Sequence, residues 1–282
     1  MPAPSPLVDR LLQLALDEDL GRGDVTSEAI FGEGDRLSAV FRPRQALTVS
    51  GLWVIERLIK LSGAEIDLTL SVADGDVVAA GGEIAIISGD ATSVLALERS
   101  CLNFLTHLSA IATFTRECVA ALGEGRARLV DTRKTTPGWR QLEKAAVRHG
   151  GGRNHRNDLS DGVMIKDNHI AAAGSLRAAV SGVRLKAHHL LRVELEVDTE
   201  VQLAEALELG VDVLMLDNFD DARALQAIQL IRAKRPETVV ELSGGITRQR
   251  LPRLQALGAD LISMGALTHS APSVDIGLDC SP

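Results

Sequence analysis

The chain has very few aromatic side chains. Its 282 residues include no tyrosine, two tryptophans and five phenylalanines. Such rings are the surfaces on which proteins stack exposed nucleic-acid bases, and the net charge of -8 at pH 7 repels a phosphate backbone. We therefore expect no nucleic-acid partner.

Long apolar runs and paired cysteines are also absent from the sequence. Charged residues or glycines interrupt each apolar stretch before it reaches the length of a membrane span, and the opening MPAPSPLVDR has no apolar signal core. Cys101, Cys118 and Cys280 form no Cys-x-x-Cys pair and have no histidine nearby at zinc-ligand spacing. The sequence predicts a globular cytoplasmic protein with reduced cysteines and no membrane partner.

Positive charge is concentrated in one part of this acidic chain. Residues 126–166 contain ten Lys or Arg and four Asp or Glu, a net +6, so the rest of the chain carries -14. A charge run is often no more than a solvated face, and composition alone leaves that reading open. The basic residues are Arg126, Arg128, Arg133, Lys134, Arg140, Lys144, Arg148, Arg153, Arg156 and Lys166.

The first half of the chain mixes helical and β patterns. Helical apolar spacing over residues 7–20 precedes several short β-like runs, and residues 92–122 then form a long helical stretch without Gly or Pro. We expect an N-terminal α+β domain over residues 1–122, with the long helix as a bridge. A second domain is expected over residues 123–282, whose final short segment can pack back on the first.

The long helical stretch carries one polar stripe. Arg99, Asn103 and His107 recur every four residues, so they share a face of the helix. A solvated stripe is one explanation. The edge of a subunit interface or of an active site is the other.

The second half alternates short apolar runs with helical segments, which is typical of parallel strands joined by right-handed crossovers. This pattern predicts an α/β domain, either an incomplete (β/α) barrel of TIM-like type or an open doubly wound sheet. A barrel gathers the carboxyl ends of its strands around one pocket, and the apolar runs end in polar or glycine residues. These endings are Asp131-Thr132-Arg133, Lys166-Asp167, Glu196, Asp217, Ser243-Gly244-Gly245 and Gly265.

One of these runs places two acids on the same face of a strand. Glu194 and Glu196 lie two residues apart, whereas Val193, Leu195 and Val197 occupy the opposite face. If the apolar face meets helices, the carboxylates point inward and need cations, a metal ion or hydroxyl donors. A solvated edge strand is the alternative.

Two kinds of loop indicate an anionic ligand. Ser243-Gly244-Gly245 and Gly265 follow the last two strands, where barrel loops commonly hold phosphate, although a Gly-Gly turn is often only a tight turn. The loop TRKTTPG from Thr132 and the run HGGGRNHR from His149 supply cations that suit carboxylates and phosphates. We therefore expect a ligand rich in those groups, with acidic strand ends facing Mg²⁺ or sugar hydroxyls.

Several short motifs follow one another along nearly the whole chain: EDLGRGDVTS, Glu98-Arg99 with Asn103, TRKTTPG, GGGRNHR, IKDNH, VELEVD, MLDN, LSGGI and SMGAL. In this order they resemble the quinolinate phosphoribosyltransferases, the carboxylating nicotinate-nucleotide pyrophosphorylases. The resemblance implies a homodimer or larger homo-oligomer with an N-terminal α+β domain and an incomplete α/β barrel. It also implies a pentosyltransferase that joins quinolinate to phosphoribosyl pyrophosphate with Mg²⁺ and releases pyrophosphate and CO₂. The product would be nicotinate mononucleotide for NAD biosynthesis.

The resemblance also implies roles for matching residues. Four side chains would surround the two carboxylates of quinolinate: Arg133, His155, Arg156 and Lys166. Arg99 would reach them from the neighbouring subunit, and Lys134 would serve the same basic wall or the pyrophosphate. Glu196 and Asp217 would face the ribose hydroxyls and Mg²⁺. The group that would hold the 5′-phosphate is Ser243, Gly244, Gly245 and Gly265.

Elementary chemistry agrees with this assignment, and two other functions stay open. Displacement of pyrophosphate from the ribose builds positive charge on the sugar and negative charge on the leaving group, which carboxylates and a basic Mg²⁺-assisted clamp stabilise. One alternative is a related phosphoribosyltransferase of the molybdate-transport-associated type with another acceptor. The other is a barrel that binds a phosphorylated ligand without turnover, which ligand-dependent stabilisation without product would support.

Overall fold

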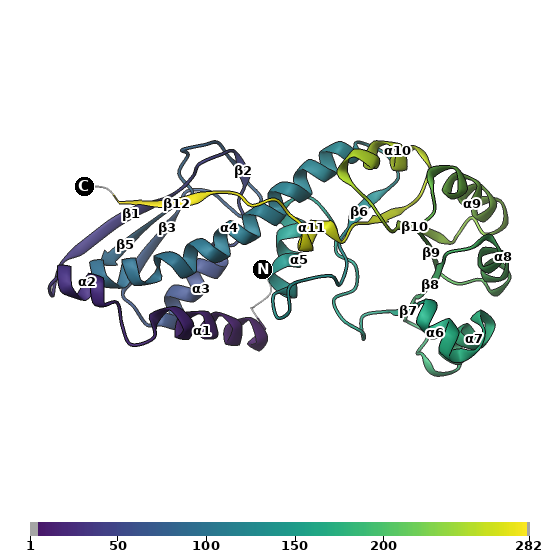
Figure 1. The fold of residues 1–282 in the computed structure, drawn as a ribbon, viewed down its shortest axis with the longest axis horizontal. Coiled ribbons are helices and arrows are strands. Elements are labelled where there is room, and N and C mark those ends of the chain that lie inside the picture. Colours follow the sequence, from purple (N-terminus) through teal and green to yellow (C-terminus); the bar gives the residue numbers. More distant parts are fainter. Residues whose placement is uncertain (1–4, 281–282) are drawn as a thin grey trace. The chain divides into compact units, whose positions relative to one another are not determined.

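The computed structural model describes residues 5–280, which form two compact units (Figure 1). The first unit contains residues 5–116, 135–151 and 267–280, and the second contains residues 117–134 and 152–266. This division differs from the boundary expected between residues 122 and 123. The C-terminal segment, which was expected to be able to pack back on the first domain, pairs with β1 there, and the helix after TRKTTPG belongs to the first unit too.

The first unit is built on a four-stranded antiparallel sheet with the order β12-β1-β5-β3. Strand β12, in yellow in Figure 1, lies beside β1 at the other end of the sequence, with Ala39 opposite Cys280 and Pro43 opposite Ile276. The C-terminal segment is therefore part of this sheet. The strands are β1 (Arg36–Pro43), β3 (Ile66–Leu70), β5 (Ala85–Asp90) and β12 (Ile276–Cys280), and a separate pair is formed by β2 (Leu47–Thr48) and β4 (Val77–Val78).

Several helices of the first unit bury an apolar face. In α1, Val8, Leu12 and Leu16 recur every four residues and are almost fully buried, each stabilising the fold by about 1.5–3 kcal/mol. The stretch after α1 contains the short helix α2, because the Asp24 side chain accepts the backbone N–H groups at its start. The helices that lie wholly or mostly in this unit are α1 (Pro6–Leu20), α2 (Val25–Ile30), α3 (Leu52–Ser62), α4 (Ala91–Leu122), α5 (Arg140–His149) and α11 (Ala266–His269).

The long helix expected over residues 92–122 is present as α4, one residue longer. Helix α5 ends against it at Gly150. A Cβ at Gly150 would meet the carbonyl oxygen of Ala112 and lie 2.6 Å from Cβ of Thr115. Glycine at this position therefore allows the end of α5 to approach the backbone of α4.

The second unit contains six parallel strands in the order β6-β11-β10-β9-β8-β7. A doubly wound sheet reverses its order at a switch point, whereas this order follows the chain and places the first strand beside the last. The sheet is therefore an incomplete barrel, with no pairing between β6 and β7 among the described residues. The strands are β6 (Arg128–Val130), β7 (Val163–Ile165), β8 (Val193–Val197), β9 (Val213–Asp217), β10 (Val239–Ser243) and β11 (Leu261–Ser263).

Helices alternate with these strands, as the sequence predicts. A side chain caps the start of each of the helices α7, α8 and α9 by accepting a backbone N–H. The accepting residues are Ser175, Thr199 and Asp220. In the part of the chain that the structure describes, no helix is both long and apolar enough to span a bilayer. The helices are α6 (Asp167–Ala173), α7 (Leu176–Lys186), α8 (Glu200–Leu209), α9 (Asp221–Lys234), the 3₁₀ turn η1 (Arg248–Arg250) and α10 (Leu251–Ala256).

Candidate active site

Polar residues from the strand ends of the second unit surround one cavity of about 380 Å³. We call it the carboxyl-end cavity. Its wall combines four Lys or Arg side chains with three carboxylates, so it suits a ligand that carries both strong negative charge and developing positive charge. The lining residues are Thr132, Arg133, Lys134, His155, Arg156, Met164, Lys166, Glu196, Met215, Asp217, Glu241, Ser243 and Ser263.

Strand register explains why these side chains converge. Glu196 of β8 pairs with Met215 of β9, and Met215 pairs with Glu241 of β10. Residues paired in a parallel sheet point to the same face, so the three form one row across the inner face of the sheet. Asp217 pairs with Ser243 two residues further on and begins a second row at the carboxyl edge.

The inward orientation expected for the acids of β8 agrees with the structure. Glu194 is only 6% exposed, and Oε2 of Glu196 lies 2.8 Å from Nζ of Lys166. The partner of Glu196 is thus a cation from the end of β7. This pair places one anion and one cation side by side in the carboxyl-end cavity.

His155 lies between two buried carboxylates. Its Nε2 is 3.2 Å from Oε2 of Glu194 and 3.6 Å from Oε2 of Glu241. Burial acts to lower the pKa of His155, but hydrogen bonding and charge from the two glutamates raise it to about 10. The backbone N–H of Arg156 donates to Nδ1 at 2.8 Å, which opposes protonation of that nitrogen.

Two arginines, Arg133 and Arg156, line the same cavity. The pKa of Arg156 is lowered by burial and by the neighbouring charge of Arg133. Nη1 of Arg156 donates to the carbonyl of Gly162 at 2.9 Å, which holds the side chain in place. Two adjacent cations in a partly buried site are the arrangement that a ligand with two carboxylates would relieve.

The end of β9 has an unusual backbone. Asn218 has a φ of 56°, the one positive φ outside glycine among the described residues, and its amide donates to Oδ2 of Asp217 at 2.6 Å. Gly244, with φ of 89°, comes so close that a Cβ there would lie 2.7 Å from the nitrogen of Asn218. Glycine at position 244 therefore lets the loops after β9 and β10 touch beside Asp217 and Ser243.

Most of the predicted site residues come together in this cavity. Those that line it are Arg133, Lys134, His155, Arg156, Lys166, Glu196, Asp217 and Ser243. Gly244 and Gly245 follow Ser243 directly, and Gly265 follows β11 by two residues, but none of the three is part of the lining. Arg99 is not part of it either.

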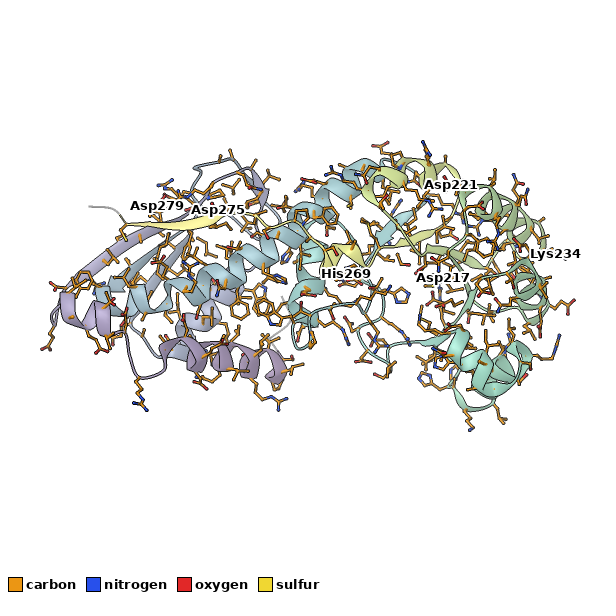
Figure 2. The ribbon with its side chains drawn as sticks, in the orientation of Figure 1. Asp217, Asp221, Lys234, His269, Asp275 and Asp279 are labelled. Atoms are coloured by element: carbon orange, nitrogen blue, oxygen red, sulfur yellow. The ribbon has the colours of Figure 1, made fainter. Side chains whose placement is uncertain are left out.

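Arg99 lines a different cavity, of about 790 Å³, within the first unit. Asn103 and His107 line it too, so the polar stripe of α4 faces a hollow of this unit. His269 and Asp275, labelled in Figure 2, contribute from the C-terminal segment. We call this hollow the helix-side cavity.

A buried carboxylate organises one wall of the helix-side cavity. Glu143 is fully buried, and its Oε1 lies 2.9 Å from Nε2 of His107. Its other oxygen accepts the backbone N–H of Thr136 at 3.1 Å. Trp139 packs edge-on against the ring of His107 and stacks on Phe104, with ring centroids 5.0 Å and 4.4 Å away.

The sequence did not identify Glu241 and Ser263, which line the cavity, or Asn218 beside it. The signal for Glu241 was present, because it lies two residues before Ser243 in VVELS, the same alternation that identified Glu194 and Glu196. Asn218 had no comparable signal. Its role depends on a backbone conformation that the sequence does not specify.

Both parts of the chain match known protein families. Residues 24–109 match the family described as quinolinate phosphoribosyl transferase, N-terminal domain. Residues 111–279 match the corresponding C-terminal domain. Together the two matches cover most of the chain.

Individual relatives agree with these matches. A probable nicotinate-nucleotide pyrophosphorylase [carboxylating] of Bacillus subtilis is 43% identical over 96% of this chain and 92% of its own. The Mycobacterium leprae nicotinate-nucleotide pyrophosphorylase [carboxylating] is 37% identical over 95% of each. The crystal structure of NadC from Streptococcus pyogenes superposes with a TM-score of 0.92 and 40% identity, covering 100% of this chain and 99% of that one.

Proposed function

We propose that this chain, which belongs to the quinolinate phosphoribosyl transferase family, carries out the family's reaction in the carboxyl-end cavity. It is a nicotinate-nucleotide pyrophosphorylase of the carboxylating type. The reaction joins quinolinate to phosphoribosyl pyrophosphate and yields nicotinate mononucleotide, pyrophosphate and CO₂ for NAD biosynthesis. The observation that carries the proposal is one cavity in which a cationic wall faces carboxylates from neighbouring strand ends.

The cationic wall suits quinolinate. Arg133 and Arg156 can each offer a planar fork to a carboxylate, and Lys166 and His155 add charge beside them. Holding the pyridine ring by both carboxylates would orient its nitrogen toward the ribose and raise the effective concentration of the nucleophile. No strong general base is needed, because the pyridine nitrogen is itself the nucleophile.

The acidic wall suits the ribose. As pyrophosphate leaves, positive charge develops on the sugar, and Glu196 and Asp217 would stabilise it electrostatically. Lys134 would stabilise the negative charge on the leaving group. After transfer the pyridine nitrogen is cationic, and this charge stabilises the carbanion left when the adjacent carboxylate departs as CO₂; uptake of one proton from solvent at that carbon gives nicotinate mononucleotide.

The 5′-phosphate would bind at the carboxyl edge of β10 and β11. Ser243 offers a hydroxyl, and the backbone N–H groups of Gly244, Gly245 and Gly265 follow the strand ends where such loops hold phosphate. The close approach of Gly244 to Asn218 supports this placement, because it brings the phosphate loop beside Asp217.

The donor set also fits Mg²⁺. Glu196 and Asp217 both present carboxylate oxygens to the carboxyl-end cavity. The sulfur atoms in its lining are the thioethers of two methionines, which are poor ligands for Mg²⁺. Mg²⁺ is usually held by one or two carboxylates together with substrate phosphates and water. When bound with phosphoribosyl pyrophosphate it would neutralise the leaving group.

Arg99 is proposed to act on the active site of a neighbouring subunit in a homodimer or larger homo-oligomer. Arg99 is exposed on the polar face of α4, where a neighbouring subunit can reach it. Mixing inactive Arg99→Ala and Arg156→Ala subunits tests this, because hybrids rebuild sites with both arginines. Random mixing of dimers would restore roughly a quarter of the sites. No regain, or full activity in a strictly monomeric enzyme, would contradict the assignment.

Turnover is the direct test of the function. Purified protein with quinolinate, phosphoribosyl pyrophosphate and Mg²⁺ should release CO₂ and form nicotinate mononucleotide. Omitting Mg²⁺ should reduce the rate strongly. Acceptors that lack one of the two carboxylates of quinolinate should react poorly. No CO₂ release under any condition tried would refute the proposal. The cytoplasmic location expected from the sequence stays a prediction.

A further inference from the structure

Two carboxylates on the inner face of the sheet have no role in the chemistry described so far. Glu241 on β10 is fully buried, and Glu194 on β8 is 6% exposed. Among the described residues, neither oxygen of Glu241 and only one oxygen of Glu194 has a hydrogen-bond partner. Buried carboxylates are unfavourable unless charge or hydrogen bonds compensate them, so their position needs a reason.

The group that both carboxylates face is the ring of His155. Its Nε2 lies 3.2 Å from Glu194 and 3.6 Å from Glu241. Its Nδ1 accepts the backbone N–H of Arg156 at 2.8 Å. A ring nitrogen that accepts an N–H carries no proton, so the proton of His155 is on Nε2 and points to the glutamates.

The backbone of the same turn is held by a third buried carboxylate. Asp131 accepts the backbone N–H of His155 at 2.8 Å and the side-chain amide of Asn154 at 2.5 Å. The His155 ring is therefore fixed at both nitrogens, and its main chain is fixed at Asp131. Because the amide of Arg156 is bonded to this ring, the base of the Arg156 side chain is fixed as well.

The same three side chains, His155, Glu194 and Glu241, could also be read as a metal site. One ligand atom from each lies within 4.8 Å of the others. A metal ion would need the lone pair of Nε2, but a neutral ring that accepts at Nδ1 carries its proton on Nε2. The hydrogen bond from Arg156 therefore favours a proton over a metal ion at this position.

We infer that Glu194 and Glu241 are positioning residues for quinolinate binding: Glu194 holds His155 through Nε2–H, the charge of Glu241 supports this orientation from 3.6 Å away, and together they set the position of Arg156. The role rests on the proposed function, in which His155 and Arg156 bind the carboxylates of quinolinate. The two glutamates act through the imidazole ring and the adjoining backbone. Their negative charge also offsets part of the cationic wall, which keeps the two arginines tolerable side by side when no substrate is bound.

The kinetic test uses Glu194→Gln and Glu241→Gln, which keep the side-chain size and one acceptor oxygen but remove the charge. We expect the KM for quinolinate to rise about tenfold or more, with the KM for phosphoribosyl pyrophosphate changed by less than about twofold. Glu194→Asp, which keeps the charge, should recover part of the loss. Glu208→Gln, an exposed residue of α8, is the matched control and should behave as the native enzyme does.

The outcome that contradicts this role is equally specific. Equal increases in both KM values would mean that the glutamates stabilise the site in general, and unchanged KM values in both variants would mean that they do not position Arg156. Circular dichroism and the midpoint of thermal unfolding identify a variant that has not folded.

A second measurement needs neither a variant nor turnover. The ¹⁵N resonances of His155 in the native protein without substrates should show Nε2 protonated throughout about pH 6 to 9. An unprotonated Nε2, or one equivalent of divalent metal retained by washed native protein and lost in Glu241→Gln, would overturn the inference. If native protein makes no nicotinate mononucleotide, the proposed function fails while this measurement still reports on the ring.

Discussion

The two cavities of this protein are both polar, but they are built differently. The carboxyl-end cavity is lined by four Lys or Arg side chains and three carboxylates, whereas the larger helix-side cavity has one arginine and one aspartate in its lining. In the first, the side chains come from the ends of several parallel strands. In the second, the face of one helix supplies Arg99, Asn103 and His107.

This difference is the reason why we propose the carboxyl-end cavity as the site of the reaction. Neighbouring parallel strands place side chains of equal register in one row, so a few residues from each strand form a dense charged wall. A helix presents a side chain to one face only every third or fourth residue, so its charges are spaced further apart. The carboxyl-end cavity should therefore control substrate binding, and the helix-side cavity should contribute more to stability and assembly.

The largest expected effect is that of Arg156→Ala in the carboxyl-end cavity. Loss of a charge-assisted contact to a carboxylate in a desolvated site should weaken quinolinate binding by about 2–5 kcal/mol, with little change in the midpoint of thermal unfolding. Isothermal titration calorimetry and the KM for quinolinate measure it. The control is Arg177→Ala, whose side chain is 58% exposed and pairs only at the surface. Native binding in Arg156→Ala would remove this residue from the site.

His107→Ala, in the helix-side cavity, is expected to change stability more than substrate binding. It leaves the fully buried carboxylate of Glu143 without its imidazole partner, which should lower the free energy of unfolding by about 1–3 kcal/mol. Urea denaturation measures the change, and the exposed His189→Ala is the control. An unchanged free energy of unfolding would show that the His107–Glu143 contact is not stabilising.

The pH dependence of stability reports on the protonation of His155 in the carboxyl-end cavity. Despite burial, Glu194 and Glu241 raise the pKa of His155 to about 10, above the unfolded value of about 6.5. A charged His155 would contribute stability that is complete below about pH 6.5 and is lost as the pH rises through about 10, so the free energy of unfolding would fall over this interval in the native protein and less in His155→Gln. The N–H that Nδ1 accepts from Arg156 favours the neutral ring inferred above, so we expect parallel curves for the two proteins. A steeper fall in the native protein would show that the ring is charged and that Nδ1 is protonated.

The smallest expected effect concerns the cysteines and compares buried with exposed positions. Burial raises the pKa of both Cys101 and Cys118 to about 12, and Cys280 is exposed. Native protein at about pH 8 should react with an alkylating reagent at one thiol, and denatured protein at three. Mass spectrometry counts the adducts. Rapid labelling of Cys101 would show that the core around α4 opens.

Much of the second unit was predictable from local pattern. Alternation of apolar strands with helices indicated parallel strands, and the inward orientation of Glu194 and Glu196 followed from their spacing of two residues. The choice between barrel and doubly wound sheet did not follow, because both have the same alternation along the chain. The pairing of β6 with β11 decided it.

The first unit was less predictable because it is assembled from distant segments. Helix α5 belongs to it, although it was expected in the second domain, and the pattern that allowed the final segment to pack back did not indicate that β12 would pair with β1. Helix α2 was also missed, since its formation depends on the Asp24 side chain capping a six-residue segment too short to show periodicity.

The sequence by itself determined the order of the elements, the residue types at the strand ends and the family, since these depend on short-range spacing and on motifs of consecutive residues. Only the tertiary structure decided that Glu241 and Glu194 meet at His155, that Arg99 lines a separate cavity and that Asn218 adopts a left-handed backbone beside Gly244. The physical reason is that strand register and loop contacts bring together residues from different parts of the chain, and no local pattern encodes such a meeting.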